Sequence, residues 1–200
     1  LFTLTAAGRA LLDDADAAAQ RTTLGLGNVN NTADADKPVS TATQAAIDAA
    51  TAATAVLELS AASTSGTAID FDVSSLTAPR EGDLFFDNVS FDNNADVLIQ
   101  LGDSNGVVTS GYTGESTATI EEASGFATNL GGGGRSFYGG VRLFRGAGNK
   151  WTARGSFRTD NGTDLLLNGT VTLTGALETI RITSVQARNF DQGSIEGIVK

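Results

Sequence analysis

The spacing of apolar positions changes near residue 56 and predicts different structures on the two sides. Residues 5–20 are mostly Ala, Leu and Asp, a composition that favours helix, and Thr5 is suited to cap its N-terminus. Residues 21–37 contain Gly25, Gly27 and several Asn and Asp residues, which favour turns. We therefore expect one helix followed by an irregular segment.

A second helical stretch is predicted after Pro38, over residues 39–56. Its apolar positions recur at spacings near three and four residues: Ala42, Ala45, Ala46, Ala49, Ala53 and Val56. Alanine buries little surface, so this helix should be marginal alone and should gain stability in a parallel bundle. A flexible linker rich in Ala and Thr is the alternative interpretation.

After residue 56 the pattern becomes alternating. Ile69, Phe71 and Val73 are separated by Asp70 and Asp72, which is typical of a strand with one solvated face. Further strands are predicted at residues 84–91, 97–101, 107–112, 117–121, 137–144, 151–157, 165–173, 179–185 and 194–199. Turn-forming residues separate these segments, as in antiparallel sandwiches and jelly rolls.

These patterns predict a mainly β chain in two parts. Residues 57–200 are expected to form an antiparallel, jelly-roll-like β-sandwich head, and residues 1–56 a short N-terminal α-helical neck or shaft. The core of the head is expected to contain Phe71, Phe86, Leu98, Val141, Phe144, Trp151, Leu173 and Ile182.

Composition excludes several kinds of chemistry. The 200 residues include no Cys and no His, so thiol nucleophiles, imidazole bases, disulfides and the usual zinc ligands are absent. No apolar run approaches the roughly 18 residues that a membrane span needs, so we expect no membrane insertion. A net charge of −10 argues against nucleic acid as a partner.

The charge is unevenly distributed within the predicted head. Residues 57–134 carry 1 basic and 12 acidic side chains, whereas residues 135–200 carry 9 basic and 5 acidic ones. The basic edge of one copy could therefore meet the acidic edge of a neighbouring copy in a closed ring. Alternatively, both sets of charges lie on solvated outer faces of strands.

Acidic residues offer two candidate sites, and neither is specific. Asp92, Asn94 and Asp96 repeat the start of a calcium loop, but Val97 stands where such a loop needs Gly, and Gly102 where it needs Glu. Paired carboxylates for glycoside hydrolysis could come from Glu81, Asp83, Asp87, Glu115, Glu121 and Glu122. Any acidic sandwich exposes such residues, so we predict no enzyme activity, metal or cofactor.

A glycine run and a set of aromatic residues complete the candidates. Residues 131–134 are all Gly but lack the Gly-Lys and the following helix of a phosphate-binding loop, so a loop between strands is expected. Tyr112, Tyr138 and Trp151 occur among arginines that include Arg135. Flat rings can stack on sugars and Arg can donate to hydroxyl or acidic groups, so these four residues are the predicted receptor-binding set. A tryptophan such as Trp151 is more often a core residue than a ligand platform, so Tyr112 and Tyr138, which have glycines nearby, are the better candidates.

Residues 7–47, AGRALLDDADAAAQRTTLGLGNVNNTADADKPVSTATQAAI, resemble a segment that recurs in bacteriophage and prophage tail fibres. The stretches GTAIDF, VLIQLGDSNGVVTSGYTG, ETIRITSV and FDQGSIEGIVK resemble the C-terminal domain of many such fibres. The ending differs from the usual one at Gln192, Glu196 and Lys200, so the resemblance does not specify a receptor.

The resemblance implies a homotrimer in the virion, at the distal end of a phage tail fibre. It implies a helical neck joined to upstream fibre or baseplate proteins, and a head that binds lipopolysaccharide or another bacterial surface glycan. Two alternatives stay open: a structural fibre section or virion decoration protein without receptor contact, and a polysaccharide depolymerase. A depolymerase would normally need a larger repeat domain than this chain offers.

Overall fold

The computed structural model describes residues 3–26, 39–53, 55–114, 123–128 and 135–200. The chain forms two compact units, Leu1–Ala46 and Ile47–Lys200. Within the described residues, three short α-helices precede the strands: α1 (Ala6–Asp13), α2 (Ala17–Thr23) and α3 (Thr41–Ala53). None of these helices is long and apolar enough to cross a membrane.

The prediction of a single helix over residues 5–20 is wrong, because a second helix begins after Asp16. The Asp16 carboxylate accepts hydrogen bonds from the backbone N–H groups of Ala18 (2.8 Å) and Ala19 (2.9 Å), which caps α2. The cap predicted at Thr5 is confirmed, since its hydroxyl accepts from the N–H of Gly8 at 3.2 Å. No described side chain of the three helices is buried, which fits their low content of large apolar residues.

The strands follow from Leu57 onwards, and residues 57–200 are called the β-domain below. The strands are β1 (Leu57–Ala62), β2 (Ala68–Asp72), β3 (Glu81–Phe91), β4 (Val97–Asp103), β5 (Gly106–Val107), β6 (Phe126–Thr128), β7 (Phe137–Arg145), β8 (Lys150–Thr159), β9 (Asp164–Thr172), β10 (Thr179–Ser184) and β11 (Phe190–Val199). The expected mainly β architecture is confirmed.

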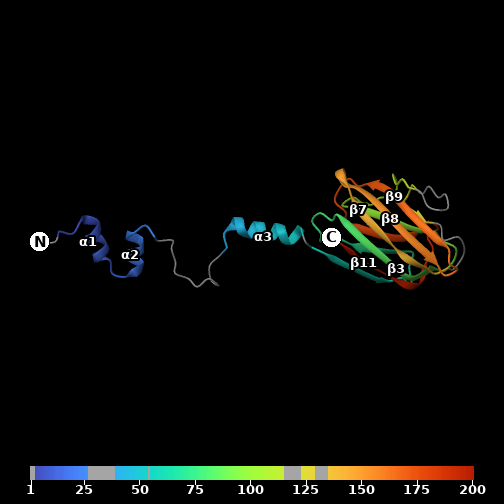
Figure 1. Cartoon of the computed structure of the whole chain (residues 1–200), viewed down its shortest axis with the longest axis horizontal. Coiled ribbons are helices and arrows are strands. Elements are labelled where there is room, and N and C mark those ends of the chain that lie inside the picture. Colours follow the sequence, from blue (N-terminus) through green and yellow to red (C-terminus); the bar gives the residue numbers. More distant parts are fainter. Residues whose placement is uncertain (1–2, 27–38, 54, 115–122, 129–134) are drawn as a thin grey trace. The chain divides into compact units, whose positions relative to one another are not determined.

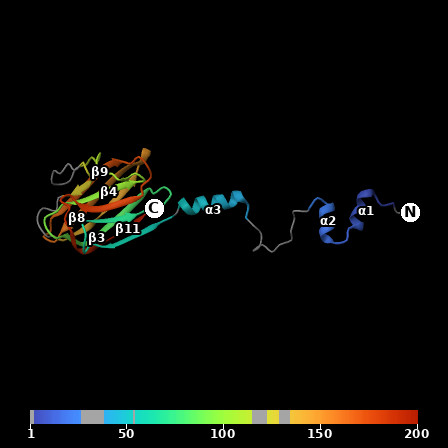
Figure 2. The ribbon, with the colours of Figure 1, turned by 180° about the vertical axis from the view of Figure 1, so that it is seen from behind.

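The strands form two antiparallel sheets (Figure 1, and from behind in Figure 2). One has six strands in the order β1-β11-β3-β7-β8-β9; the other has the order β2-β10-β4-β5, with β6 also paired to β4. The first and last strands are neighbours, with Leu57 opposite Val199. Buried side chains from both sheets belong to one hydrophobic cluster, an arrangement consistent with a β-sandwich.

A cluster of phenylalanine rings fills one part of this core. Phe137 has its ring centroid 5.6 Å from that of Phe157, 5.8 Å from Phe86 and 6.1 Å from Phe91. Phe190 lies 4.7 Å from Phe91 and extends the cluster to β11. Of these rings, the sequence predicts only Phe86 for the core. Phe86 and Phe157 alternate with exposed residues along their strands, whereas Phe91 lies in a fully buried stretch at the end of β3.

Some expectations for the β-domain need correction. The strand expected over residues 107–112 is too long, since β5 ends at Val107. Phe144, expected in the core, is 38 % exposed, because it lies on the opposite side of β7 from the buried Leu143. The other residues expected in the core are buried. The strand predicted over residues 117–121 and the loop predicted over residues 131–134 lie outside the described residues.

Asp103 anchors the turn between β4 and β5 to the segment after β9. Its carboxylate is buried and accepts hydrogen bonds from the Thr174 hydroxyl (2.7 Å) and from the backbone N–H groups of Asn105, Thr174 and Gly175 (2.9 Å each). These donors, the Thr174 hydroxyl first, lower the pKa of Asp103 from 3.8 to about 2.

Replacing Asp103 by Asn is expected to lower the free energy of unfolding at pH 7 by about 1–3 kcal/mol. The three backbone N–H groups that donate to the carboxylate would then lose their charged acceptor. The folded-state pKa is depressed, so the stabilisation is complete above the ordinary value of 3.8 and disappears as the pH falls through about 2. Urea denaturation across this range should show the two proteins converging in acid. Asp160→Asn, in an exposed turn, is the control, and an equal loss there would contradict the assignment.

Candidate binding face

The large hydrophobic residues that the described β-domain exposes all lie on one surface. They are Phe85 on β3 (56 % exposed), Tyr138 (43 %) and Phe144 (38 %) on β7, and Leu166 on β9 (55 %). Each alternates with buried residues of its strand, so all four side chains point away from the core, on the outer side of the six-stranded sheet. We call this surface the binding face. Grouping of exposed apolar residues on one face is a common sign of a contact surface.

Strand register sets the polar side chains of the binding face in rows. One row crosses β3, β7, β8 and β9 through Asp83, Arg142, Arg154 and Asn168. The next row crosses the same strands through Phe85, Gly140, Ser156 and Leu166. Two small residues therefore lie between two large apolar ones, next to a pair of arginines.

The two arginines differ in their partners. Arg142 donates to Glu81 at 2.8 Å and lies 3.3 Å from an oxygen of Asp83, and its guanidinium carbon is 5.1 Å from the centroid of the Phe144 ring. These acids raise the pKa of Arg142 further above its ordinary value, and the largest cause is the hydrogen bond that Arg142 donates to Glu81. Arg154 is exposed, and its side chain makes no ion pair or hydrogen bond with any described residue.

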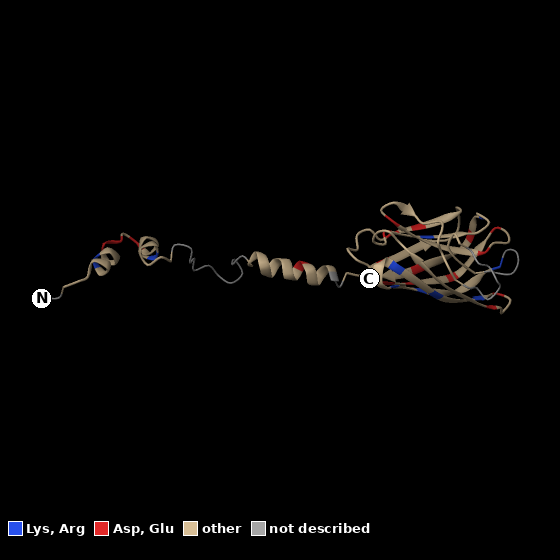
Figure 3. Ribbon diagram, turned by 90° about the horizontal axis from the view of Figure 1, so that it is seen from above, with Lys and Arg blue, Asp and Glu red and all other residues tan. Residues whose placement is uncertain are grey.

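The acidic segment, residues 57–134, and the basic segment, residues 135–200, form ion pairs with each other within one chain. β3 carries Glu81 and Asp83 and lies beside β7, so Arg142 is neutralised there, and Glu81 also pairs with Lys200 at 3.1 Å. Figure 3 shows basic and acidic positions distributed over the same strands. On the other sheet, Arg181 of β10 pairs with Asp70 of β2 at 2.7 Å. The acidic and basic halves of the β-domain sequence therefore form ion pairs between neighbouring strands of one chain, whatever they do between copies.

Two shallow hollows flank Arg154. One, of about 360 Å³, is lined by residues that include Phe85, Gly140, Arg154 and Ser156. The other, of about 610 Å³, is lined by residues that include Arg154, Leu166 and Asn168. Gly140 lines the first hollow, and a Cβ atom there would lie 3.0 Å from the Leu84 carbonyl oxygen and 3.6 Å from a carbon of the Phe85 ring.

Tyr138 is held at one end of the binding face by a polar network. Its hydroxyl donates to the side-chain oxygen of Asn88 at 2.7 Å, and Gln192 donates to the same oxygen at 3.2 Å and to Ser136 at 2.6 Å. Asn88 lies in a β-bulge with φ of 53°, opposite Gly193 with φ of 93°. A side chain at Gly193 would place its Cβ 2.4 Å from the Asn88 carbonyl oxygen, so glycine is required there.

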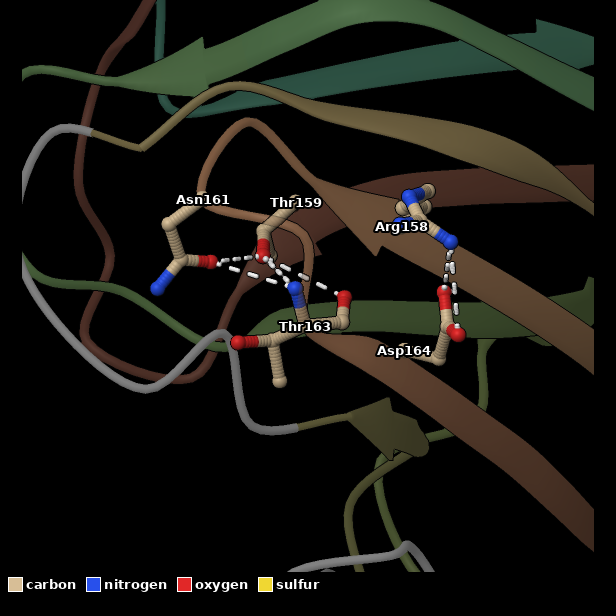
Figure 4. Close-up of polar contacts among 5 residues, drawn as sticks. All are labelled: Arg158, Thr159, Asn161, Thr163 and Asp164. Carbon is tan, nitrogen blue, oxygen red and sulfur yellow. Dashed lines mark hydrogen bonds and ion pairs between the residues drawn. The ribbon is translucent and has the colours of Figure 1, made fainter.

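The turn between β8 and β9 closes the same end (Figure 4). Arg158, opposite Tyr138 in register, pairs with Asp164 at 3.2 Å. In the turn itself, Thr163 donates its backbone N–H to the hydroxyl of Thr159 (3.2 Å) and to the side-chain oxygen of Asn161 (3.3 Å). The turn is therefore closed by its own side chains, which supports the register of β8 and β9 beneath the binding face.

The structure separates the four residues of the predicted receptor-binding set. Tyr138 is exposed on the binding face, and Arg135 is partly exposed just before β7, with its guanidinium 3.9 Å from Asp160. Tyr112 and Trp151 are buried, so neither ring offers a face to a ligand in the single chain. The Tyr112 hydroxyl accepts from the N–H of Leu101 at 2.7 Å, and burial raises its pKa to about 12. Both rings are assigned to the core.

The burial of Trp151 has a direct spectroscopic consequence. It is the sole tryptophan of the chain and is 0 % exposed, and its indole N–H has no hydrogen-bond partner among the residues that the structure describes. We expect fluorescence emission at shorter wavelength than that of free tryptophan, with little quenching by acrylamide, until the protein is unfolded in guanidinium. Emission typical of a solvated indole in the native protein would contradict this placement.

The acidic loop that resembles a calcium site has a structural role. Asp92 accepts from the Asn189 side chain at 3.1 Å, and Asp96 accepts from the Gln186 side chain at 2.8 Å, so both carboxylates hold the segment between β10 and β11. Among the residues that the structure describes, no group of three His, Cys, Asp or Glu side chains could hold a metal ion.

Comparison of the chain with protein-family models, with curated proteins and with solved structures gave no match. Any function must therefore be inferred from the residues and geometry above.

Proposed function

We propose that the chain is the distal region of a bacteriophage tail fibre, located in the virion, which attaches to a bacterial surface glycan or lipopolysaccharide without catalysing a reaction. The observation that carries this proposal is the binding face. Exposed Phe85, Tyr138 and Leu166 share one sheet surface with two hollows and with an arginine that pairs with no described residue. Glycans are bound by such combinations of flat apolar surface and oriented polar groups.

A homotrimer with a jelly-roll-like head belongs to the same proposal. The helical segments leave large side chains exposed, among them Leu12 (70 %), Leu24 (57 %) and Ile47 (48 %). Packing against the same helices of other copies, in a neck joined to upstream fibre or baseplate proteins, would bury them.

Incubation of the purified chain with a panel of bacterial strains tests the proposal. Pull-down measures binding, an assay of the supernatant measures released sugar, and light scattering measures the mass of the protein. The proposal predicts a trimer that binds at least one strain and releases no sugar. Sugar release would point to a depolymerase instead, and a trimer that binds no strain would point to a structural section of the fibre.

A further inference from the structure

The centre of the binding face holds a cation, Arg154, that has no anionic partner among the described residues. Arg154 lines both hollows and makes no ion pair with a described residue, whereas its cross-strand neighbour Arg142 is shared by Glu81 and Asp83. The guanidinium is always charged and presents its donors in a planar fork that matches a carboxylate. The middle of the face is therefore suited to one isolated negative group.

The surroundings of Arg154 fit a sugar that carries this negative group. The hollows of about 360 and 610 Å³ lie within the range of roughly 300–1,000 Å³ typical of small-ligand sites. Phe85 is more than half exposed and offers an apolar surface to the C–H face of a ring. Ser156 and Asn168, on the rows described above, offer neutral donors and acceptors for hydroxyl groups.

The charge around the face limits the ligand further. The chain carries a net charge of −10, and Asp83 lies two strands from Arg154 in the same row. A polyanion such as nucleic acid needs several unpaired cations, which the described part of the face does not provide. A saccharide with widely spaced carboxylates needs only one.

We propose that the binding face takes an acidic saccharide, with the carboxylate of a uronic or sialic acid on Arg154 and its ring against Phe85. This proposal rests on the proposed function, because it names the class of glycan that the adhesive head would recognise. The site assignment can be measured without any bacterial cell.

Titration of the ¹⁵N-labelled full chain, followed by TROSY NMR, tests the site. The probes are methyl glycosides of glucuronic, galacturonic and sialic acid, with methyl glucoside and methyl galactoside as neutral counterparts. We expect shifts on β3, β7 and β8 around Phe85, Arg142 and Arg154 with at least one acidic glycoside. Absence of shifts with all three acids, equal shifts with the neutral sugars, or shifts confined to another surface would each overturn the proposal.

A matched pair of variants assigns the role of Arg154. Arg154→Gln should weaken binding of the acidic glycoside by on the order of tenfold, because a charge-assisted hydrogen bond is lost. Arg188→Gln removes the same charge from another exposed arginine, and it should leave the affinity unchanged. Equal affinities of both variants and the original chain would refute the role of Arg154.

Pull-down of cells separates this site from the adhesive function. If the original chain and Arg154→Gln bind cells equally well, the adhesive function stands and this site is rejected. If the original chain binds no cell, the adhesive function alone is rejected.

Discussion

Replacing Phe137 by Ala is expected to lower the free energy of unfolding by about 3–5 kcal/mol. Its side chain is 0 % exposed and contacts the rings of Phe86, Phe91 and Phe157, which come from β3 and β8. Removing the ring leaves a cavity that strands held by long hydrogen-bonded ladders cannot close. The loss is a large fraction of the roughly 5–15 kcal/mol that a domain of this kind possesses. Guanidinium denaturation followed by Trp151 fluorescence measures it.

Phe144→Ala is the matched control for this prediction. It removes the same side chain from the same strand, but Phe144 is on the binding face and contacts Arg142. The expected loss is about 1 kcal/mol or less, since only partial burial and one cation–π contact disappear. A similar loss for both variants would mean that the two faces of β7 are wrongly assigned.

Alternation of apolar residues explains why most of the β-domain could be predicted from the sequence. A strand with one buried face repeats every second residue, and β2 or β8 shows this over its whole length. β6 has three residues, which is too short for a periodic signal. β1 alternates, but its alanines continue the composition of the preceding helix, and its partner β11 lies at the far end of the chain. Pairing over that distance leaves no local trace in the sequence.

The sequence gives a weaker indication of the binding face, which can be interpreted only once it is known which residues of each strand face the core. Leu84, Phe85 and Phe86 are consecutive and apolar, as are Leu165, Leu166 and Leu167, so the middle residue of each run must point away from the core. By the same reasoning Trp151 shares the phase of the buried Ala153, which places it inside. The proximity of Arg142 and Arg154 could not be predicted, because it depends on the register of β7 and β8.

Removal of residues 1–56 is expected to reduce binding to host cells by about 100-fold to 10,000-fold, although the binding face is retained. All the strands that the structure describes begin at or after Leu57, so residues 57–200 keep both sheets. The helices bury none of their described side chains in the single chain, and losing them removes little of its core. In the proposed trimer, however, these helices hold three heads together. A shallow, open site binds weakly alone, and joining three sites raises the effective concentration of the second and third without any new contact.

The comparison requires that the truncated protein differs from the full chain in association only. Light scattering should give the mass of a monomer for residues 57–200 and a higher mass for residues 1–200, while the Trp151 emission of the two proteins should coincide. A fusion of residues 57–200 to an unrelated trimeric coiled coil should then restore most of the cell binding, because avidity depends on the number and spacing of the sites. Equal binding by the monomer and the full chain would refute avidity, whereas failure of the coiled-coil fusion would assign a direct receptor contact to the helical segment.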